Sequence, residues 1–290
     1  MKALLLCSLF MNLAFAKNTI TSSIVDFETS SNSPNVFHLY LDSGEVLHSN
    51  DLLQSMKILS KENQLFTFEF DSDHKLLSAT PLVREEVIAT RELKVNDEEY
   101  TPSRLTEDQL KENFKFLRKG ARSFSQCFNR AHIWAYESKK TLNIQSMKVF
   151  LFFTKKFIRE NNFKWWFHVA PANYLQSSRQ NELFVLDPYF TSKPLPLHEW
   201  SRLFVSKNIH CLEARVFSDY ELNQEKESCL IIKSSMYYLQ PKDLRALEVR
   251  KEYKKTWLKG EIERAYRNGF GIWRKKFTQE EETRNDNSPN

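Results

Sequence analysis

The chain has 290 residues, of which 41% are hydrophobic and 27% are charged. At this length we expect about two domains, and the apolar share is large enough to bury a sizeable core. Only five glycines are present, and they are not spaced to build a dinucleotide-binding loop, a phosphate-binding loop or the nucleophile turn of an α/β-hydrolase. The composition therefore excludes a disordered chain and these three kinds of site.

The N-terminus has the pattern of a secretory signal. Lys2 precedes an apolar stretch that closes with alanine, phenylalanine and alanine at residues 14–16. The longest later apolar run, residues 149–153, is far shorter than the roughly 20 residues that a membrane anchor needs. We therefore predict a signal peptide over residues 1–16 and a secreted or periplasmic protein that begins at Lys17, without a transmembrane anchor. The alternative is a poorly folded apolar N-terminus.

Three cysteines remain once Cys7 is removed with the signal. An odd number in an exported protein indicates one disulfide and one free thiol. Cys211 and Cys229 lie 18 residues apart in one C-terminal segment, so we predict that they pair. The alternative is that both are buried thiols. The predicted pairing leaves Cys127 as the free thiol.

Charge is distributed unevenly along the chain. Residues 17–105 carry a net charge of −7 and residues 106–290 a net charge of +11, so the two parts attract each other. The basic excess is concentrated in residues 241–276, which contain 12 basic and 5 acidic side chains. Such a run indicates either nucleic-acid binding or a solvated helix face. Because an exported protein rarely meets nucleic acid, we favour the helix face and expect no nucleic-acid partner.

The region from residue 20 to about residue 95 has a strand-like pattern. Short apolar segments alternate with polar turns, and the segments are residues 36–41, 45–47 and 65–70. The pattern breaks around residues 100–103, which include a proline. We therefore predict a small β-rich domain over residues 17–105.

The remainder of the chain mixes helical and strand-like patterns. Thr106 and Gln109 form a capping-box signature at the start of a helix that Gly120 ends. The next predicted elements are a helix from Cys127 to about Lys139, strands at residues 147–153, 165–170 and 183–186, and a mostly charged helix over residues 244–273. From these patterns we divide the region into a domain of residues 106–240, a basic helical extension of residues 241–277 and a disordered tail of residues 278–290.

Three residues in this region have the order of a thiol-enzyme triad. Cys127 begins a helix, and the positive end of a helix dipole favours the nucleophilic thiolate form of a cysteine. His168 interrupts an apolar strand, and Asp187 closes another strand before Pro188. A thiolate needs a histidine to transfer protons and a carboxylate to orient that histidine. Each residue also has an ordinary reading: a buried thiol, a hydrogen-bonded core histidine and a turn-forming aspartate.

The residues around these three resemble the bacterial protein-glutaminases. Residues 127–132 read Cys-Phe-Asn-Arg-Ala-His and are similar to the C-x-x-R-A-H segment of that family. Residues 165–170 are similar to its W-x-x-H-V-A strand, and residues 185–188 to its strand that ends in Asp-Pro. Pro194 and Trp200 echo the family's residues beyond that aspartate, and residues 236–238 are expected to match a late strand. The resemblance spans roughly residues 120–240 and implies a papain/transglutaminase-like α+β fold, in which the helix bearing the cysteine packs on an antiparallel sheet.

The resemblance implies a hydrolase that converts protein-bound glutamine to glutamate and ammonia. Cys127 would attack the side-chain amide, His168 would protonate the departing ammonia, and Asp187 would hold the imidazole. The backbone N–H of Cys127 is the expected oxyanion donor, with Gln126 as a weaker candidate. We expect Arg130 and His132 to pack the helix against the sheet, and Trp165 and Trp166 to bind substrate unless they belong to the core.

Other readings stay open at this point. The same triad would serve a transglutaminase or a cysteine peptidase, and a non-catalytic secreted binding protein is the third possibility. The histidines show no HExxH pattern and the cysteines no paired spacing, so we expect neither a metal nor a cofactor. The expected partners are proteins or peptides that bear glutamine, and we expect a monomer.

Protein-glutaminases are made with an N-terminal pro-region that covers the cleft. The resemblance therefore implies that residues 17–105 form a removable pro-region, which docks over Cys127 and is released by cleavage near residues 100–104. The alternative is a permanently attached accessory domain that binds substrate or cell wall.

Overall fold

The chain forms two compact units. The computed structural model describes residues 17–30, 33–59, 64–82, 101–123, 125–176, 182–250 and 256–272. The predicted signal peptide and the predicted tail of residues 278–290 lie outside the described residues. The first unit contains Met1–Leu41 and Val46–Glu85, and the second contains Asp42–Glu45 and Glu86–Asn290. The sequence pattern places the boundary at residue 105, whereas the structure divides the chain earlier and assigns the short segment Asp42–Glu45 to the second unit.

The first unit consists of two small antiparallel sheets and one helix. Its elements are β1 (Asn18–Ser22), β5 (Phe66–Phe70) and β6 (Leu76–Pro81) in one sheet, β2 (Ile24–Thr29), β3 (Phe37–Leu41) and β4 (Val46–Ser49) in the other, and helix α1 (Leu52–Leu59). Alternate residues of β1 and β5 are buried, as expected for strands with one face toward a core. That core contains Leu39, Leu47 and Phe68, each fully buried. The predicted strands are confirmed, while the strand pattern of this region does not predict α1.

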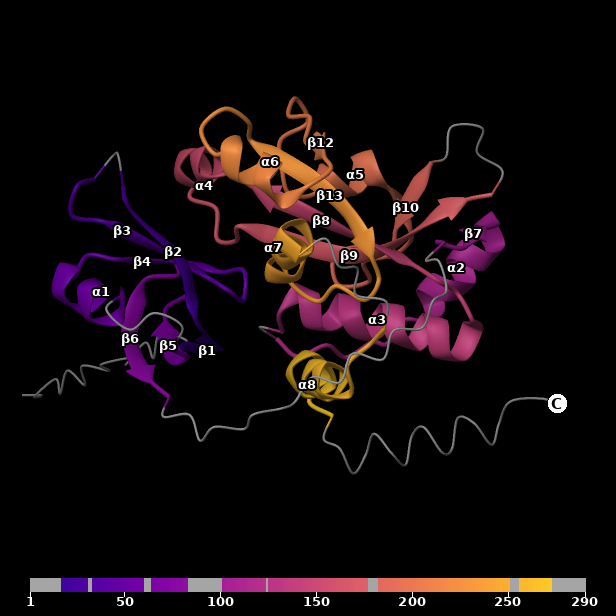
Figure 1. The fold of residues 1–290 in the computed structure, drawn as a ribbon, viewed down its shortest axis with the longest axis horizontal. Helices are drawn as coiled ribbons and strands as arrows, with labels where there is room; N and C mark the ends of the chain where they lie inside the picture. Colours follow the sequence, from indigo (N-terminus) through magenta and orange to yellow (C-terminus); the bar gives the residue numbers. More distant parts are fainter. Residues whose placement is uncertain are drawn as a thin grey trace, which may run out of the picture. The chain divides into compact units, whose positions relative to one another are not determined.

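The second unit is built on a seven-stranded sheet, in which β7 lies off the main path (Figure 1). Its strands run in the order β11 (Leu195–Pro196), β10 (Leu183–Val185), β9 (Phe167–Leu175), β8 (Met147–Phe153), β13 (Cys229–Ser235) and β12 (Leu212–Ala214), and β7 (Arg104–Leu105) pairs with β9. The central pairs are antiparallel, while β12 and β7 add parallel pairs at the sides. Every residue of β8 is buried, which explains why its sequence is a continuous apolar run with one lysine.

Seven helices accompany this sheet in the described part of the second unit. They are α2 (Glu107–Phe116), α3 (Cys127–Leu142), α4 (Lys155–Asn161), α5 (Leu197–Ser201), α6 (Phe217–Leu222), α7 (Pro241–Arg250) and α8 (Lys259–Phe270). The capping box at Thr106 is confirmed, because its hydroxyl accepts from the Gln109 N–H at 3.2 Å and its own N–H donates to Gln109 Oε1 at 2.9 Å. The helix ends at Phe116 rather than at Gly120, since Leu117 leaves helical geometry and packs into the core. Among the described residues, no helix has the length and apolar character that crossing a membrane requires.

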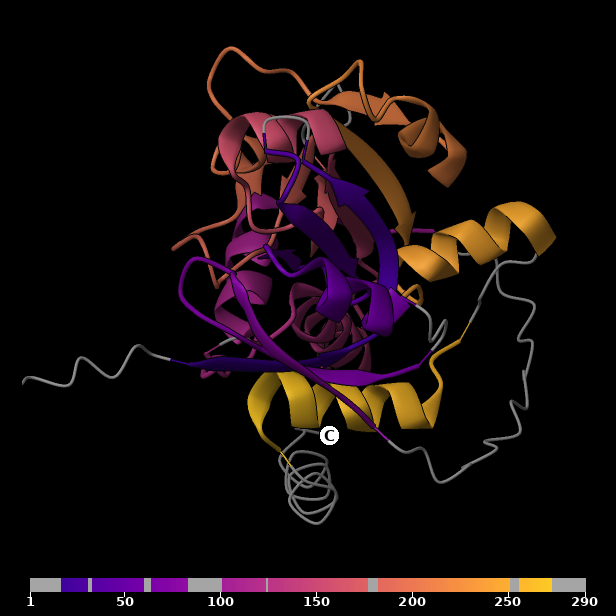
Figure 2. The ribbon, with the colours of Figure 1, turned by 90° about the vertical axis from the view of Figure 1, so that its left-hand side faces the viewer.

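Helix α3 lies between the sheet and α8 (Figures 1 and 2). Ile133 of α3 packs against Ile262 and Tyr266 of α8. A Cβ atom on Gly269 would lie 3.5 Å from the Cβ of Asn129, so the absence of a side chain at Gly269 lets the two helices approach closely. The α+β class, with the helix that carries the free cysteine packed on a mostly antiparallel sheet, is therefore confirmed.

A buried polar cluster also joins α3 to α8. Glu137 Oε1 accepts from Arg118 Nε at 2.8 Å, from Arg118 Nη2 at 2.6 Å and from the Tyr266 hydroxyl at 2.9 Å. Burial, followed by the neighbouring Glu137 charge, raises the pKa of Tyr266, so this hydroxyl stays protonated and can donate. The cluster fixes the axial position of α8 along α3.

The prediction of one charged helix over residues 244–273 is wrong. Helix α7 ends at Arg250 and α8 begins at Lys259, with Leu258 in extended geometry at the start of α8. The charged composition hides this break because both helices are rich in lysine and arginine. It also hides the buried stripe of α8, which makes this helix part of the packed unit rather than a solvated extension.

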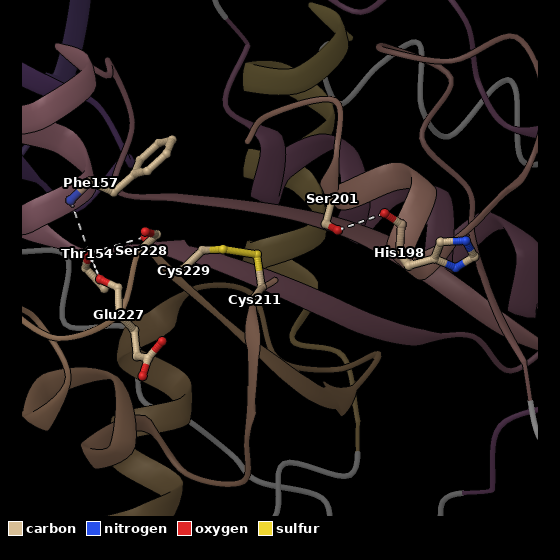
Figure 3. The surroundings of a disulfide bond; sticks show 8 residues. All are labelled: Thr154, Phe157, His198, Ser201, Cys211, Glu227, Ser228 and Cys229. Atoms are coloured by element: carbon tan, nitrogen blue, oxygen red, sulfur yellow. Dashed lines mark hydrogen bonds between the residues drawn. A yellow bond between two sulfur atoms is a disulfide. The ribbon is translucent and has the colours of Figure 1, made fainter. Parts of the chain in front are cut away.

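The disulfide between Cys211 and Cys229 is confirmed (Figure 3). Cys229 is the first residue of β13 and is fully buried, so the bond ties the segment before β12 to the start of its parallel neighbour. Beside it, the Thr154 hydroxyl donates to the carbonyl of Glu227 at 2.6 Å. The expectation of a late strand at residues 236–238 is wrong, because pairing between β13 and β8 ends at Ser235.

Removing the disulfide should destabilise the second unit. The bond closes a loop with a sequence separation of 18 residues and so restricts the unfolded chain. Removing it gives the unfolded chain more conformational freedom, which lowers the free energy of unfolding by about 3 kcal/mol for a loop of this size. Cys211→Ala/Cys229→Ala should therefore unfold at lower urea concentration than the wild type, as followed by tryptophan fluorescence. Cys127→Ala, which removes the free thiol, is the matched control. Equal midpoints for the double variant and the wild type would contradict a stabilising role.

Candidate active site

Cys127 is the first residue of helix α3. Gln126 before it has extended geometry, with φ −67° and ψ 139°, so the helix and its aligned peptide dipoles start at the cysteine. The thiol is free and only 9% of the residue is exposed. The structure therefore places this sulfur at the positive end of a 16-residue helix.

His168 and Asp187 come from neighbouring strands of the sheet. His168 is the second residue of β9, and Asp187 follows β10, which pairs with β9. The Leu186 N–H donates to the Pro171 carbonyl at 2.8 Å, so the antiparallel pairing continues to the residue before Asp187. This register puts Asp187 diagonally opposite His168 on the same face of the sheet.

The side chains of the two residues meet in a buried hydrogen bond. His168 Nε2 lies 2.7 Å from Asp187 Oδ2, and the indole N–H of Trp200 donates to the same oxygen at 3.0 Å. Cys127 lies close enough to His168 to raise the pKa of the imidazole. Because Nε2 faces the carboxylate, Nδ1 is the nitrogen left for the thiol. The structure thus brings together all three residues that the sequence singles out.

Electrostatics favour the charged forms of His168 and Asp187. Burial lowers the pKa of His168, but the Asp187 charge, its hydrogen bond and Cys127 outweigh burial and raise that pKa to about 9. Burial raises the pKa of Asp187, yet the His168 cation, the Trp200 hydrogen bond and Arg130 together hold it below its usual value. The imidazole is therefore a cation at neutral pH, with a proton available on each nitrogen.

Aromatic rings surround the His168 imidazole. The ring centroids of Phe204, Phe190 and Trp200 lie 4.8, 5.1 and 5.5 Å from its own. Such rings exclude water and strengthen the interaction of the imidazole with its carboxylate. The sequence indicates Trp200 only through its similarity to the family, and it does not single out Phe190 or Phe204. The pair Tyr189-Phe190, directly after the Asp-Pro turn, is the sequence feature that could have indicated aromatic residues near His168.

The structure places the two tryptophans proposed as substrate contacts differently. Only 6% of Trp166 is exposed, and its ring packs against Phe152 and Tyr220 in the core. The ring of Trp165 instead contacts Phe190, with centroids 6.1 Å apart, and so reaches the surroundings of His168. Core packing thus accounts for the Trp166 ring, while Trp165 stays a candidate for contact with substrate.

A short turn, Asp42–Glu45, pairs with the residues just before His168. The Trp166 N–H donates to the Gly44 carbonyl at 2.9 Å, and Glu45 forms an antiparallel bridge with Trp165. Gly44 has φ +101°, and a Cβ there would lie 3.0 Å from the Phe167 ring, so this position requires glycine. Burial raises the pKa of Glu45 to about 7, against the opposing effects of the Ser43 hydrogen bond and the Arg130 charge. The local backbone pattern did not predict this pairing.

His132 packs the nucleophile helix against the sheet, as expected from the sequence. It is fully buried, and its Nδ1 lies 2.8 Å from the Nζ of Lys148, the lysine of β8. The same Nζ donates to the carbonyl of Tyr238 at 2.5 Å. The polar link therefore joins α3, β8 and the chain after β13.

The described residues offer no competing metal site, since no three histidine, cysteine or acidic side chains among them gather closely enough to hold an ion. A separate pocket of about 550 Å³ is lined by residues from α5, β13 and the segment around the disulfide, including His198, Ser201 and Cys211. None of Cys127, His168 and Asp187 lines this pocket. The candidate site of Cys127, His168 and Asp187 is therefore distinct from this pocket.

The His168 imidazole should titrate near pH 9, and Asp187→Asn should lower that value because the carboxylate stabilises the cation. Cys127→Ala should lower it by less, since the thiol contributes less. Histidine ring resonances of ¹⁵N-labelled protein give the titration directly. By linkage, the stability that the raised pKa of His168 contributes is complete below pH 6.5 and is lost as the pH rises through about 9. Identical titration in the wild type and Asp187→Asn would contradict the assignment.

Comparison with known proteins places this site in a recognised segment. Residues 103–204 match the family model described as glutaminase, whereas no curated protein matches the chain. A crystal structure of pro-protein-glutaminase is similar to this chain, with 12% sequence identity and a TM-score of 0.47. The match covers 76% of this chain and 83% of that chain. The NMR structure of protein-glutaminase from Chryseobacterium proteolyticum is 14% identical in sequence, with a TM-score of 0.31. That match covers 46% of this chain and 74% of the other chain. The resemblance to the protein-glutaminase family is therefore confirmed over residues 103–204, which contain Cys127, His168 and Asp187.

Proposed function

We propose that the protein is a protein-glutamine deamidase, which converts glutamine side chains of proteins to glutamate and releases ammonia. The observation that carries this proposal is the buried hydrogen bond between His168 and Asp187, with Cys127 close to the same imidazole, within the segment that matches the glutaminase family. The predicted signal peptide and the disulfide support a secreted or periplasmic location.

The first half of the proposed reaction forms a thioester. The Cys127 thiolate attacks the carbonyl carbon of the glutamine amide, and a C–S bond forms as the oxygen takes up negative charge. The backbone N–H of Cys127, at the start of α3, is the proposed donor to this oxyanion. His168 then gives its Nδ1 proton to the amide nitrogen, the C–N bond breaks and ammonia leaves. Asp187 holds the imidazole orientation throughout.

The second half regenerates the thiolate. The neutral His168 accepts a proton from water at Nδ1, and the resulting hydroxide attacks the thioester carbon. The C–S bond breaks, the carboxylic acid product gives its proton to solvent water and becomes glutamate, and the thiolate again faces the imidazolium. The raised pKa of His168 is consistent with a resting thiolate–imidazolium pair, because it keeps the ring protonated at neutral pH.

We further propose that a substrate chain binds in extended form along Trp165 and Trp166. The support is the segment Asp42–Glu45, which already pairs with the backbone of these two residues. Because that segment belongs to the stretch of residues 17–105, we propose that this stretch is a pro-region that keeps the site closed. A permanently attached accessory domain is the alternative.

Activity should depend on both partners of the proposed reacting pair. Cys127→Ala and His168→Ala should each lower the rate of ammonia release by about 10⁴-fold or more, since nucleophile and base act as one unit. Asp187→Asn should leave more residual activity. Ammonia is assayed on a glutamine-containing protein together with glutamate formation by mass spectrometry, and the exposed His198→Ala is the matched control.

The same assay separates the deamidase from its alternatives. A transglutaminase would produce cross-linked substrate when lysine amines are present, and a cysteine peptidase would shorten the substrate chain. Retention of most activity by Cys127→Ala would contradict the triad. Absence of ammonia release from the cleaved wild-type protein would contradict the deamidase itself.

Limited proteolysis of residues 17–290 should increase the rate of ammonia release. Arg104 lies in β7 and pairs with Tyr174 of β9, so the activating cut is expected before this residue rather than at it. Gly44→Val, which places a side chain against Phe167, should raise the rate without cleavage. The cleaved Cys127→Ala variant is the control, because any ammonia that it releases does not come from a reaction at Cys127. No gain from cleavage would rule out the inhibitory role and favour an accessory domain.

A further inference from the structure

Arg130 is a buried cation one helical turn after Cys127. Only 3% of the residue is exposed. Its Nη1 donates to the carbonyl of Ser125 and, at 2.9 Å, to the Ser125 hydroxyl, so the guanidinium holds the chain that leads into α3. Burying a charge is costly unless other groups compensate it, which means that the surroundings of this side chain are specific.

The face of the same guanidinium covers the ring of Tyr189. Arg130 Cζ lies 3.9 Å from the Tyr189 ring centroid, well within the range of a cation–π contact. Tyr189 belongs to a turn that begins at Asp187, whose carbonyl accepts from the N–H groups of Phe190 at 3.1 Å and Thr191 at 2.9 Å. Arg130 therefore contacts the turn that carries the Asp187 carboxylate.

These contacts close a ring of interactions around the site. Cys127 meets His168, and His168 meets Asp187. The turn after Asp187 presents Tyr189 to Arg130, which returns to the helix that begins with Cys127. The Arg130–Tyr189 contact thus adds a connection beside the site to the link that His132 and Lys148 already make between α3 and the sheet.

The positive charge of Arg130 also connects this residue with Asp187. The positive charge of Arg130 is one of the influences that lower the pKa of Asp187, after the larger effects of His168 and Trp200. Among the described residues, Arg130 Nε and Asp187 Oδ1 are both buried and have no hydrogen-bond partner. The two opposite charges thus stabilise each other through space in a water-poor environment.

We propose that Arg130 is a positioning residue, whose guanidinium clamps the turn of residues 187–191 to the start of α3 and so fixes the His168 imidazole against the Cys127 sulfur. This inference rests on the proposed function of the site and goes beyond the packing role that the sequence suggests for Arg130. The planar guanidinium can donate to Ser125 along its edge while its face covers Tyr189. The ammonium of a lysine has no such face, so Arg130→Lys keeps the charge and loses the clamp.

The first test needs no substrate. Alkylation of Cys127 by iodoacetamide across pH 5 to 9 reports how well the imidazolium stabilises the thiolate. Arg130→Lys and Tyr189→Leu should both slow alkylation at the acidic end, whereas Arg264→Lys, an exposed arginine of α8, is the matched control. Tyr189→Phe keeps the ring under the guanidinium and should change the profile less than Tyr189→Leu.

The second test uses ammonia release from a glutamine-containing protein. Arg130→Lys should lower kcat by about 10- to 100-fold with little change in KM, because misplacing a reacting group by about 1 Å costs on this order. Adding Tyr189→Leu to Arg130→Lys should cost little more, since both remove one contact. Tyr189 is 45% exposed, so its variant keeps the test valid if Arg130→Lys does not fold.

The outcomes separate the two proposals. Wild-type alkylation profiles in both Arg130→Lys and Tyr189→Leu would overturn the clamp, as would fully additive effects of the two substitutions on kcat. Loss of thermal stability with an unchanged alkylation profile would mean that Arg130 only packs the helix. Absence of ammonia release from the cleaved wild-type protein would refute the deamidase, while the alkylation profiles would still decide the role of Arg130.

Discussion

The buried hydrogen bond between His168 and Asp187 is the interaction on which the rest of the second unit depends. Two charges removed from water are stable only if their geometry is fixed and further donors compensate them. The pairing of β9 with β10 fixes the backbones, Trp200 supplies the second donor, and Phe190 and Phe204 exclude water. The apolar surroundings make the pair costly, since burial lowers the pKa of His168, and the Asp187 charge and hydrogen bond are what keep the imidazole charged.

The Cys127 thiol depends on a different set of contacts. Its position follows from that of helix α3, which is fixed from two sides. His132 and Lys148 join it to β8, while Glu137 and Gly269 determine how α8 packs on its other side. Helix α8, which from its composition looks like part of a basic extension, therefore supports the element that carries the thiol. Charge counts could not reveal this because the contacts depend on a narrow apolar stripe and one glycine.

Much of the candidate site could be predicted from the sequence, because its signals are local. A cysteine at a helix start, a histidine inside an apolar strand and an aspartate before proline are visible within windows of a few residues, as is the capping box at Thr106. The contacts of Arg130 with Tyr189 and of Gly44 with Trp166 are not visible, since residues distant in sequence meet there. Their geometry follows from strand order and register, which no single segment encodes.

Strand register has a further consequence for how this chain can vary. His168 pairs with Leu151 across the β8–β9 ladder, and successive side chains of β9 point to opposite faces. A slip of the β9 pairing by one residue would turn Phe167 or Val169 toward the thiol, with the imidazole on the far face. A slip of two residues would preserve the face but move the imidazole along the strand. The register of β9 is thus constrained by parity as well as by distance.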